Sequence, residues 1–210
     1  MNDHYLYQLI NALCSAMAVR DFYTHTHQQN VSNISRLIAQ ELELPDAQIE
    51  VIRLAAMLHD VGKIGIPTNL LTKAGSLRKE EFELIKLHSV IGEEILQGVD
   101  FKFPISTIIR QHHERLDGSG YPDGLLGNEI MLEAKIIAVA DVVESMSSSR
   151  AYRKALGLTE AINEINEQRG ILYDSKVVDA CNKLYQKNLL NQSHSEGLWG
   201  GARSILQVIE

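Results

Sequence analysis

HHERLDGSGYP, residues 112–122, is the most informative stretch of this chain, and HDVGK, residues 59–63, is its counterpart upstream. Each stretch joins histidine to an acidic residue, ends a segment of helical period and runs into a glycine-containing loop. Imidazole and carboxylate groups together bind divalent transition metals, and such ions hydrolyse phosphate esters. The two stretches together predict a metal-dependent phosphohydrolase, which either of them alone would only suggest.

Length and charge limit the possible classes of protein. The chain has 210 residues, 45% of them hydrophobic, which is enough for one core and short for two independent domains. Its net charge is −7 and it has no run of lysine or arginine, which argues against binding to long nucleic acids. A small anionic substrate remains compatible, because metal ions and a few basic residues can offset the global charge.

Cysteine usage and apolar segments indicate the compartment. Cys14 and Cys181 form neither a disulfide framework nor a zinc-knot spacing. The N-terminus lacks a basic segment followed by an apolar one, and no apolar run approaches the roughly 20 residues needed to cross a bilayer. We therefore expect a cytoplasmic protein without a membrane segment.

The apolar residues recur with the period of helices along most of the chain, which predicts an all-α fold. Residues 62–67 are predicted to form a turn-rich loop, and the composition becomes polar and glycine-rich from residue 191. We assign residues 1–188 to one domain and residues 189–210 to a C-terminal tail. The predicted helices cover residues 2–19, 24 or 26 to 43, 46–60, 79–97, 104–114, 132–148, 158–168 and 174–188.

Five of these helices each carry a ligand-type side chain on an apolar stripe. A single histidine in such a place is more often a hydrogen-bonded core residue than a metal ligand. Five such groups together favour metal ions as their partners, since an unpaired buried carboxylate is costly. The stripes are His27 with Val31, Ile34 and Ile38; His59 with Ile52 and Ala55; His88 with Leu84, Ile91 and Ile95; His112 with Ile105 and Ile108; and Asp141 with Ala134, Ile137 and Ala138.

The adjacent pairs of ligand-type residues favour two ions over one. Neighbours on a helix point about 100° apart, so His59 and Asp60 serve two ions more easily than one. Asp60 is the natural bridge between them, and His112 and His113 can divide in the same way. Two such ions can hold a bridging hydroxide as nucleophile for in-line displacement at phosphorus. The alternative, a single structural zinc, is disfavoured because no cysteine lies nearby.

The sequence resembles the HD-GYP family, a subgroup of the HD metal-dependent phosphohydrolases. The resemblance implies an HD-domain-like helical bundle with additional C-terminal helices. It also implies a bacterial, cytoplasmic phosphodiesterase that linearises cyclic di-GMP or 3',3'-cyclic GMP-AMP, with iron or manganese preferred and nickel or zinc possible. The motifs that carry it are DxYTxxH at 21–27, HDVGKIGIP at 59–67, His88, HHERxDGxGYP at 112–122, AD at 140–141 and RxYR at 150–153, over residues 5–188.

The family's metal ligands can be carried over to positions of this chain. Some members bind a third ion through a glutamate four residues before the first histidine, where this chain has Tyr23. The resemblance therefore implies a two-ion site that stops at the linear dinucleotide pGpG. The implied ligands are His27, His59, Asp60, His88, His112, His113 and Asp141.

Substrate contacts are implied at further positions. Asp60 and Lys63 are the expected catalytic residues, with Lys63 on the scissile phosphate, and Arg150 and Arg153 match the family's pair for the substrate's phosphates. Without the family, the lysine would be read as a solvated loop residue and the arginines as surface cations.

The loop after His113 is also expected to lie near the substrate. The tight backbone at Gly120 suits such a loop, while Tyr121 either contacts the ligand or packs the loop. The chain departs from the family pattern at Leu116, Ala151 and Glu144. Glu144 replaces an aspartate and is expected to alter substrate positioning.

Two other functions remain open. An HD-type nucleotidase would explain His27, His59, Asp60 and Asp141, but not the later histidines. A non-catalytic module would sense the messenger, or dock onto a GGDEF-type cyclase domain through residues 115–127; such docking could also accompany catalysis.

Overall fold

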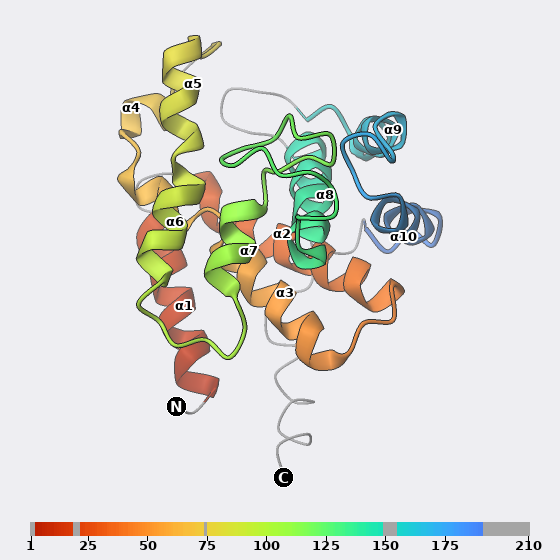
Figure 1. Cartoon of the computed structure of the whole chain (residues 1–210), viewed down its shortest axis with the longest axis horizontal. Coiled ribbons are helices and arrows are strands. Elements are labelled where there is room, and N and C mark those ends of the chain that lie inside the picture. Colours follow the sequence, from red (N-terminus) through yellow and green to blue (C-terminus); the bar gives the residue numbers. More distant parts are fainter. Residues whose placement is uncertain (1–2, 19–21, 74, 149–154, 191–210) are drawn as a thin grey trace.

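The computed structural model describes residues 3–18, 22–73, 75–148 and 155–190, which form a helical bundle (Figure 1). Within these ranges the β structure is limited to two isolated bridges, so the predicted all-α class is confirmed. The helices are α1 (Asp3–Ala18), α2 (Phe22–Glu41), α3 (Asp46–Leu58), the 3-10 helix η1 (Val61–Gly65), α4 (Thr68–Leu71), α5 (Lys79–Lys86), α6 (His88–Leu96), α7 (Ile105–Gln111), α8 (Leu132–Ser147), α9 (Leu158–Glu167) and α10 (Ser175–Gln186).

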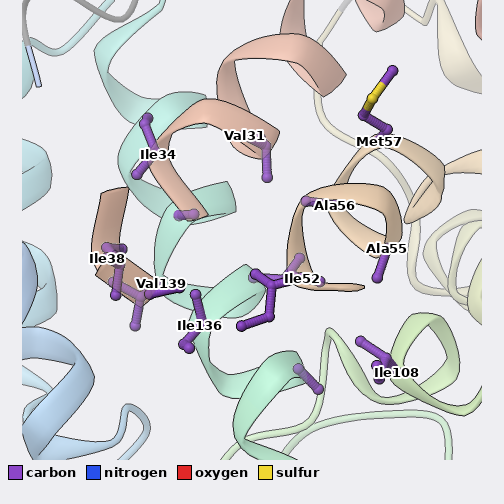
Figure 2. Close-up of a cluster of buried hydrophobic side chains, with 14 of the residues drawn as sticks. Val31, Ile34, Ile38, Ile52, Ala55, Ala56, Met57, Ile108, Ile136 and Val139 are labelled. Carbon is purple, nitrogen blue, oxygen red and sulfur yellow. The ribbon is translucent and has the colours of Figure 1, made fainter. Parts of the chain in front are cut away.

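The core lies where α2, α3 and α8 meet. Figure 2 shows Ile38 of α2 next to Val139 of α8, with Ile136 of α8 and Ile52 of α3 in the same buried cluster. These aliphatic side chains are almost completely buried. The predicted stripe of His27 is therefore correct, since this face of α2 is the one that packs inward. Helices α9 and α10 pack against α8, which confirms the additional C-terminal helices.

The end of α3 turns the chain sharply. Asp60 leaves the helical conformation, with φ −97° and ψ 5°, and η1 follows directly. A Cβ atom on Gly62 would lie 1.9 Å from the carbonyl oxygen of His88 and 2.5 Å from the amide nitrogen of Gly92. Only glycine allows this approach of two backbones. The predicted loop at 62–67 is thus partly a 3-10 turn, and it holds the end of α3 against α6.

The single helix predicted at 79–97 is wrong, because Leu87 separates α5 from α6. The predicted stripe of His88 is also wrong, since Leu84 is 47% exposed and Ile95 is 40% exposed. The buried face of α6 instead runs through His88, Gly92 and Leu96. Its position follows from the contact with η1, which needs the small residue Gly92 on that side.

The remaining expectations about domain organisation concern the C-terminus. Residues 191–210 lie outside the described residues, so the domain boundary at 188 stays a prediction. Among the described residues, no helix combines the length and apolarity needed to span a membrane.

Candidate metal centre

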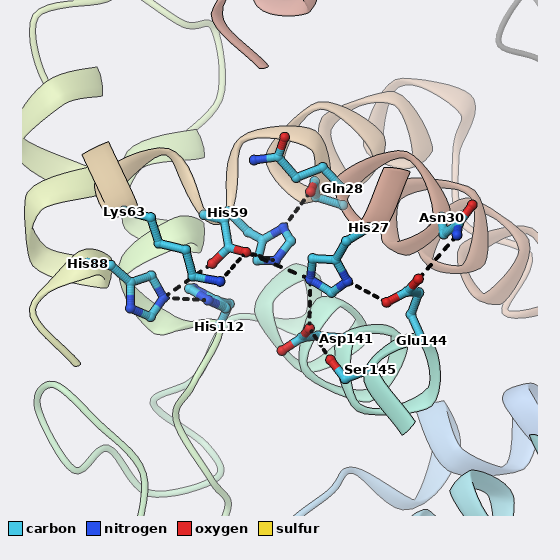
Figure 3. Close-up of polar contacts among 12 residues, drawn as sticks. His27, Gln28, Asn30, His59, Lys63, His88, His112, Asp141, Glu144 and Ser145 are labelled. Atoms are coloured by element: carbon cyan, nitrogen blue, oxygen red, sulfur yellow. Dashed lines mark hydrogen bonds and ion pairs between the residues drawn. The ribbon is translucent and has the colours of Figure 1, made fainter. Parts of the chain in front are cut away.

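The fold brings all seven predicted ligand residues together. Figure 3 shows His27, His59, His88, His112 and Asp141 among them. They fall into three overlapping groups, and within each group the ligand atoms lie within 4.8 Å of one another. Five of the seven are buried, while His113 and Asp141 are partly exposed. The groups are His27, His59 and Asp141; His59, Asp60 and His112; and His88, His112 and His113.

Three of the histidines are oriented by the main chain. The Nδ1 atom of His59 lies 2.6 Å from the carbonyl oxygen of Ala56, three residues earlier. His88 and His112 repeat this arrangement with the carbonyls three residues before them, at 2.7 and 2.5 Å. Carbonyls in the last turn of a helix can accept hydrogen bonds from side chains, so they accept the Nδ1 proton and leave Nε2 of the neutral ring without one.

The Nε2 atoms of these rings lie close to other ligand-type atoms of the cluster. Nε2 of His59 is buried and has no hydrogen-bond partner in the part of the chain that the structure describes. Nε2 of His88 lies 3.3 Å from Nε2 of His112. Leaving a buried polar atom unsatisfied costs about 1–3 kcal/mol. A cation bound between these nitrogens would satisfy them, so the donor set fits a metal ion.

The environment keeps the imidazoles of His112 and His113 neutral. Burial holds the pKa of His112 well below its usual range, and the neighbouring His59 and His88 lower it further. Burial also holds the pKa of His113 well below its usual range, with added lowering from His112 and His88. Neutral imidazole is the form that binds transition metals.

The carboxylates of the cluster are ionised. Burial alone would raise the pKa of Asp60, but Lys63 and His59 hold it well below its usual range. Burial alone would also raise the pKa of Asp141, but its hydrogen bond to His27 holds that pKa well below its usual range. Burial would lower the pKa of His27, yet hydrogen bonds to Asp141 and Glu144 raise it to about 9.

Asp60 lies between the two sets of histidines. Its Oδ1 atom is 3.6 Å from Nε2 of His88, and its Oδ2 atom is 3.4 Å from Nε2 of His59 and 3.7 Å from Nε2 of His27. Lys63 places its ammonium group 2.6 Å from the same Oδ2 atom. Asp60 thus lies close to histidines of both sets, and its role as a bridge between two ions stays a prediction.

The centre opens into a cavity of about 260 Å³. Besides ligand-type residues, its wall contains Lys63, Tyr121 and Ile85. The cavity gives a small molecule access to the carboxylates of Asp60 and Asp141. Its lining residues are His27, Asp60, Lys63, Ile85, His88, His113, Tyr121, Asp141 and Ser145.

A loop that is closed by hydrogen bonds to Glu114 forms one wall of this cavity. The buried carboxylate of Glu114 accepts hydrogen bonds from the backbone N–H groups of Asp123, at 2.7 Å, and Leu125, at 3.0 Å. A Cβ atom on Gly120 would lie 2.4 Å from Cα of Glu114, so glycine is required there. The ring of Tyr121 stacks on His113 with centroids 4.6 Å apart. Glu114 and Gly120 thus hold Tyr121 at the cavity.

The predicted substrate residues differ in whether the structure describes them and in whether they line the cavity. Lys63 and Tyr121 line the cavity, whereas Gly120 packs against the backbone behind it. Arg150 and Arg153 lie outside the described residues. The sequence reasoning missed Glu114 and Ser145, and it did not foresee that Glu144 contacts His27. The sequence contained one signal for Glu144, which is an acidic residue within the apolar helix predicted at 132–148.

Comparison with known proteins identifies the family. The model of the HD domain family matches residues 11–177. The chain belongs to the HD domain family. The HD-GYP resemblance is confirmed by curated relatives, and the solved structures share the fold.

This HD domain is 41% identical over 175 residues to the cyclic di-GMP phosphodiesterase response regulator RpfG of Xanthomonas campestris, covering 82% of this chain and 46% of that protein. It is 33% identical over 199 residues to 3'3'-cGAMP-specific phosphodiesterase 3 of Vibrio cholerae, covering 93% of this chain and 42% of that protein. A solved structure of a cyclic GMP-AMP specific phosphodiesterase from V. cholerae has a TM-score of 0.66 at 18% identity, covering 90% of this chain and 51% of that one. The chain spans about half the length of the relatives it matches.

Proposed function

We propose that this HD domain hydrolyses a cyclic dinucleotide, cyclic di-GMP or 3',3'-cyclic GMP-AMP, to the linear dinucleotide. The observation that carries the proposal is the position of Asp60, whose two oxygens face different histidines of one cluster beside an open cavity. The names of the relatives supply the substrate class. An HD-type nucleotidase would leave His88, His112 and His113 without a role.

Two divalent ions fit the ligand groups. His27, His59 and Asp141 would hold one ion, and His88, His112 and His113 the other, with Asp60 shared between them. When bound, such ions supply Lewis-acid stabilisation of the phosphoryl oxygens and lower the pKa of water. We propose iron or manganese, while nickel and zinc also suit imidazole and carboxylate ligands. Tyr23, one turn before His27, takes the position of the third-ion glutamate, which supports the linear dinucleotide as the product.

The residues around the cluster would bind and orient the substrate. Lys63 is 25% exposed in its side chain and faces the cavity, where its positive charge can contact the scissile phosphate. Burial raises the pKa of Tyr121, so its hydroxyl stays protonated and can donate to an anionic substrate. Gly120 contributes by letting the loop approach, and Arg150 and Arg153 remain proposed phosphate contacts.

The partner and the location remain proposals as well. Leu126, in the loop at 115–127, is 53% exposed and offers an apolar contact to a GGDEF-type cyclase domain. A cytoplasmic location in bacteria agrees with the proposed substrate.

Chromatographic product analysis tests the proposed function. The protein is loaded anaerobically with iron or manganese and incubated with each cyclic dinucleotide, beside Asp60→Asn and the matched control Asp179→Asn. Asp179 is an exposed partner of Arg169 and lines no part of the cavity. We expect a linear dinucleotide from the wild type and the control and none from Asp60→Asn. Bound metal without turnover in the wild type would favour the non-catalytic sensor instead.

A further inference from the structure

His27 differs from the other buried histidines in how its ring is oriented. His59, His88 and His112 each direct Nδ1 at a main-chain carbonyl of the preceding turn. His27 directs Nδ1 at the carboxylate of Glu144, which comes from α8, 117 residues away in sequence (Figure 3). A carboxylate is a stronger hydrogen-bond acceptor than a carbonyl.

Glu144 is itself fixed in place. Its side chain is 1% exposed and does not line the cavity. The Oε2 atom faces Nδ1 of His27. The Oε1 atom accepts hydrogen bonds from the amide of Asn30, at 3.1 Å, and from the hydroxyl of Ser148, at 2.8 Å. Each carboxylate oxygen therefore has its own partners.

We infer that Glu144 is a positioning residue that acts through His27 on one of the two proposed ions. It holds the proton of His27 on Nδ1 and turns Nε2 toward Asp141, whose Oδ1 atom lies 3.2 Å away. The inference rests on the proposed two-ion site. It predicts different behaviour for the two ions, because only the affinity of the ion held by His27, His59 and Asp141 depends on Glu144. The ion of His88, His112 and His113 does not, since two of these rings are oriented by carbonyls.

The variant Glu144→Gln reverses the hydrogen bond while keeping the shape. Asn30 and Ser148 both donate to Oε1, so the single oxygen of glutamine belongs at that position. The amide nitrogen then faces His27 and donates to Nδ1, which moves the imidazole proton to Nε2. A protonated Nε2 cannot bind a metal ion. Glu144→Asp keeps the acceptor but withdraws it by one methylene.

Metal content and affinity test the inference without an activity assay. Wild type, Glu144→Gln, Glu144→Asp and the control Glu133→Gln are loaded with manganese, freed of excess metal by gel filtration and titrated with a chelator. Glu133 lies on the same helix and accepts a hydrogen bond from Gln48, away from the cluster. We expect two ions in the wild type and the control. In Glu144→Gln one ion weakens about 10–100-fold and the other keeps its affinity. In Glu144→Asp the same ion weakens less.

Each other result counts against the inference. Two ions of wild-type affinity in Glu144→Gln overturn it, and so does equal weakening of both ions in a variant whose helical content is normal. Equal weakening in the aspartate and glutamine variants would indicate packing rather than the acceptor. If Glu144→Gln does not fold, Glu144→Asp decides, and unchanged affinities for both ions overturn the inference. A wild type that holds fewer than two ions contradicts the proposed function itself.

Discussion

At the scale of single residues, a substitution of Lys63 should lower the rate of substrate hydrolysis without changing metal binding. Its ammonium group lies 2.6 Å from Asp60 and faces the cavity. In Lys63→Gln we expect kcat to fall roughly 10²-fold, the usual effect of removing one positioned charge or donor from a reacting oxyanion. Metal content should stay at the wild-type value. Steady-state kinetics and metal analysis beside Lys79→Gln, an exposed lysine of α5, check this, and an unchanged kcat would contradict the proposed role of Lys63.

Gly62 carries a second prediction at this scale. Its Cβ position is occupied by the backbone of His88, which cannot move without shifting α6. We expect Gly62→Ala to lower the free energy of unfolding by about 3 kcal/mol, at the upper end for overpacking. Gly98→Ala is the control, since nothing lies within 4 Å of its Cβ position. Urea unfolding of both variants checks the difference, and equal stabilities would contradict the close contact between η1 and α6.

The proposed ligand residues could be named from the sequence because short motifs keep them at fixed spacings, and the structure brings them together. Glu144 could be noticed as a departure, but its contact could not be predicted. Its partner His27 lies 117 residues away, and only the packing of α2 on α8 brings the two together. Glu114 was part of a motif, yet its role in clasping the loop depends on backbone groups up to 11 residues further along.

At the scale of elements, the start of α5 is held by an ionised carboxylate. Glu81 accepts hydrogen bonds from Lys73, at 2.5 Å, and from the backbone N–H of Arg78, at 2.7 Å. These contacts lower its pKa from 4.5 to about 2. The folded-state pKa lies below the unfolded value, so the stabilisation is complete above pH 4.5 and is lost as the pH falls toward 2.

Hydrogen exchange of the backbone amides of α5 measures the stabilisation that ionised Glu81 provides. We expect the protection of the first turn of α5 to fall between pH 4.5 and 2 in the wild type, after correction for the intrinsic exchange rate. Glu81→Gln should show weak protection at every pH. A wild-type protection that does not change over this range would show that the carboxylate does not hold the helix start.

Helix positions were more predictable than helix faces. The periods of α2, α3 and α8 agree with their buried sides, because these helices are covered by the core. The apolar period of residues 79–97 predicted the wrong buried face for two reasons. Helix α5 extends away from the bundle (Figure 1). Helix α6 is positioned by the backbone contact of Gly92 with η1 rather than by the packing of its isoleucines. An apolar pattern records hydrophobicity and not the identity of the neighbouring element.

At the scale of the whole molecule, five elements from distant parts of the sequence supply one cluster, so the centre exists only in the folded chain. The all-α class followed from periodicity, and the convergence of the ligands followed from the motifs. The adjacent ligand-type pairs of the sequence predict two ions, and this number stays a proposal. The position of Asp60, within 3.6 Å of both His59 and His88, supports it.

Electron paramagnetic resonance of the manganese-loaded chain tests the proposed two-ion centre most directly. If Asp60 is shared by two ions, the wild type should bind two manganese ions per chain and show the spectrum of an exchange-coupled pair. Asp60→Asn should lose that coupling, while Asp179→Asn should keep it. A wild type that shows only isolated manganese, with one ion per chain or two uncoupled ions, would contradict the shared centre.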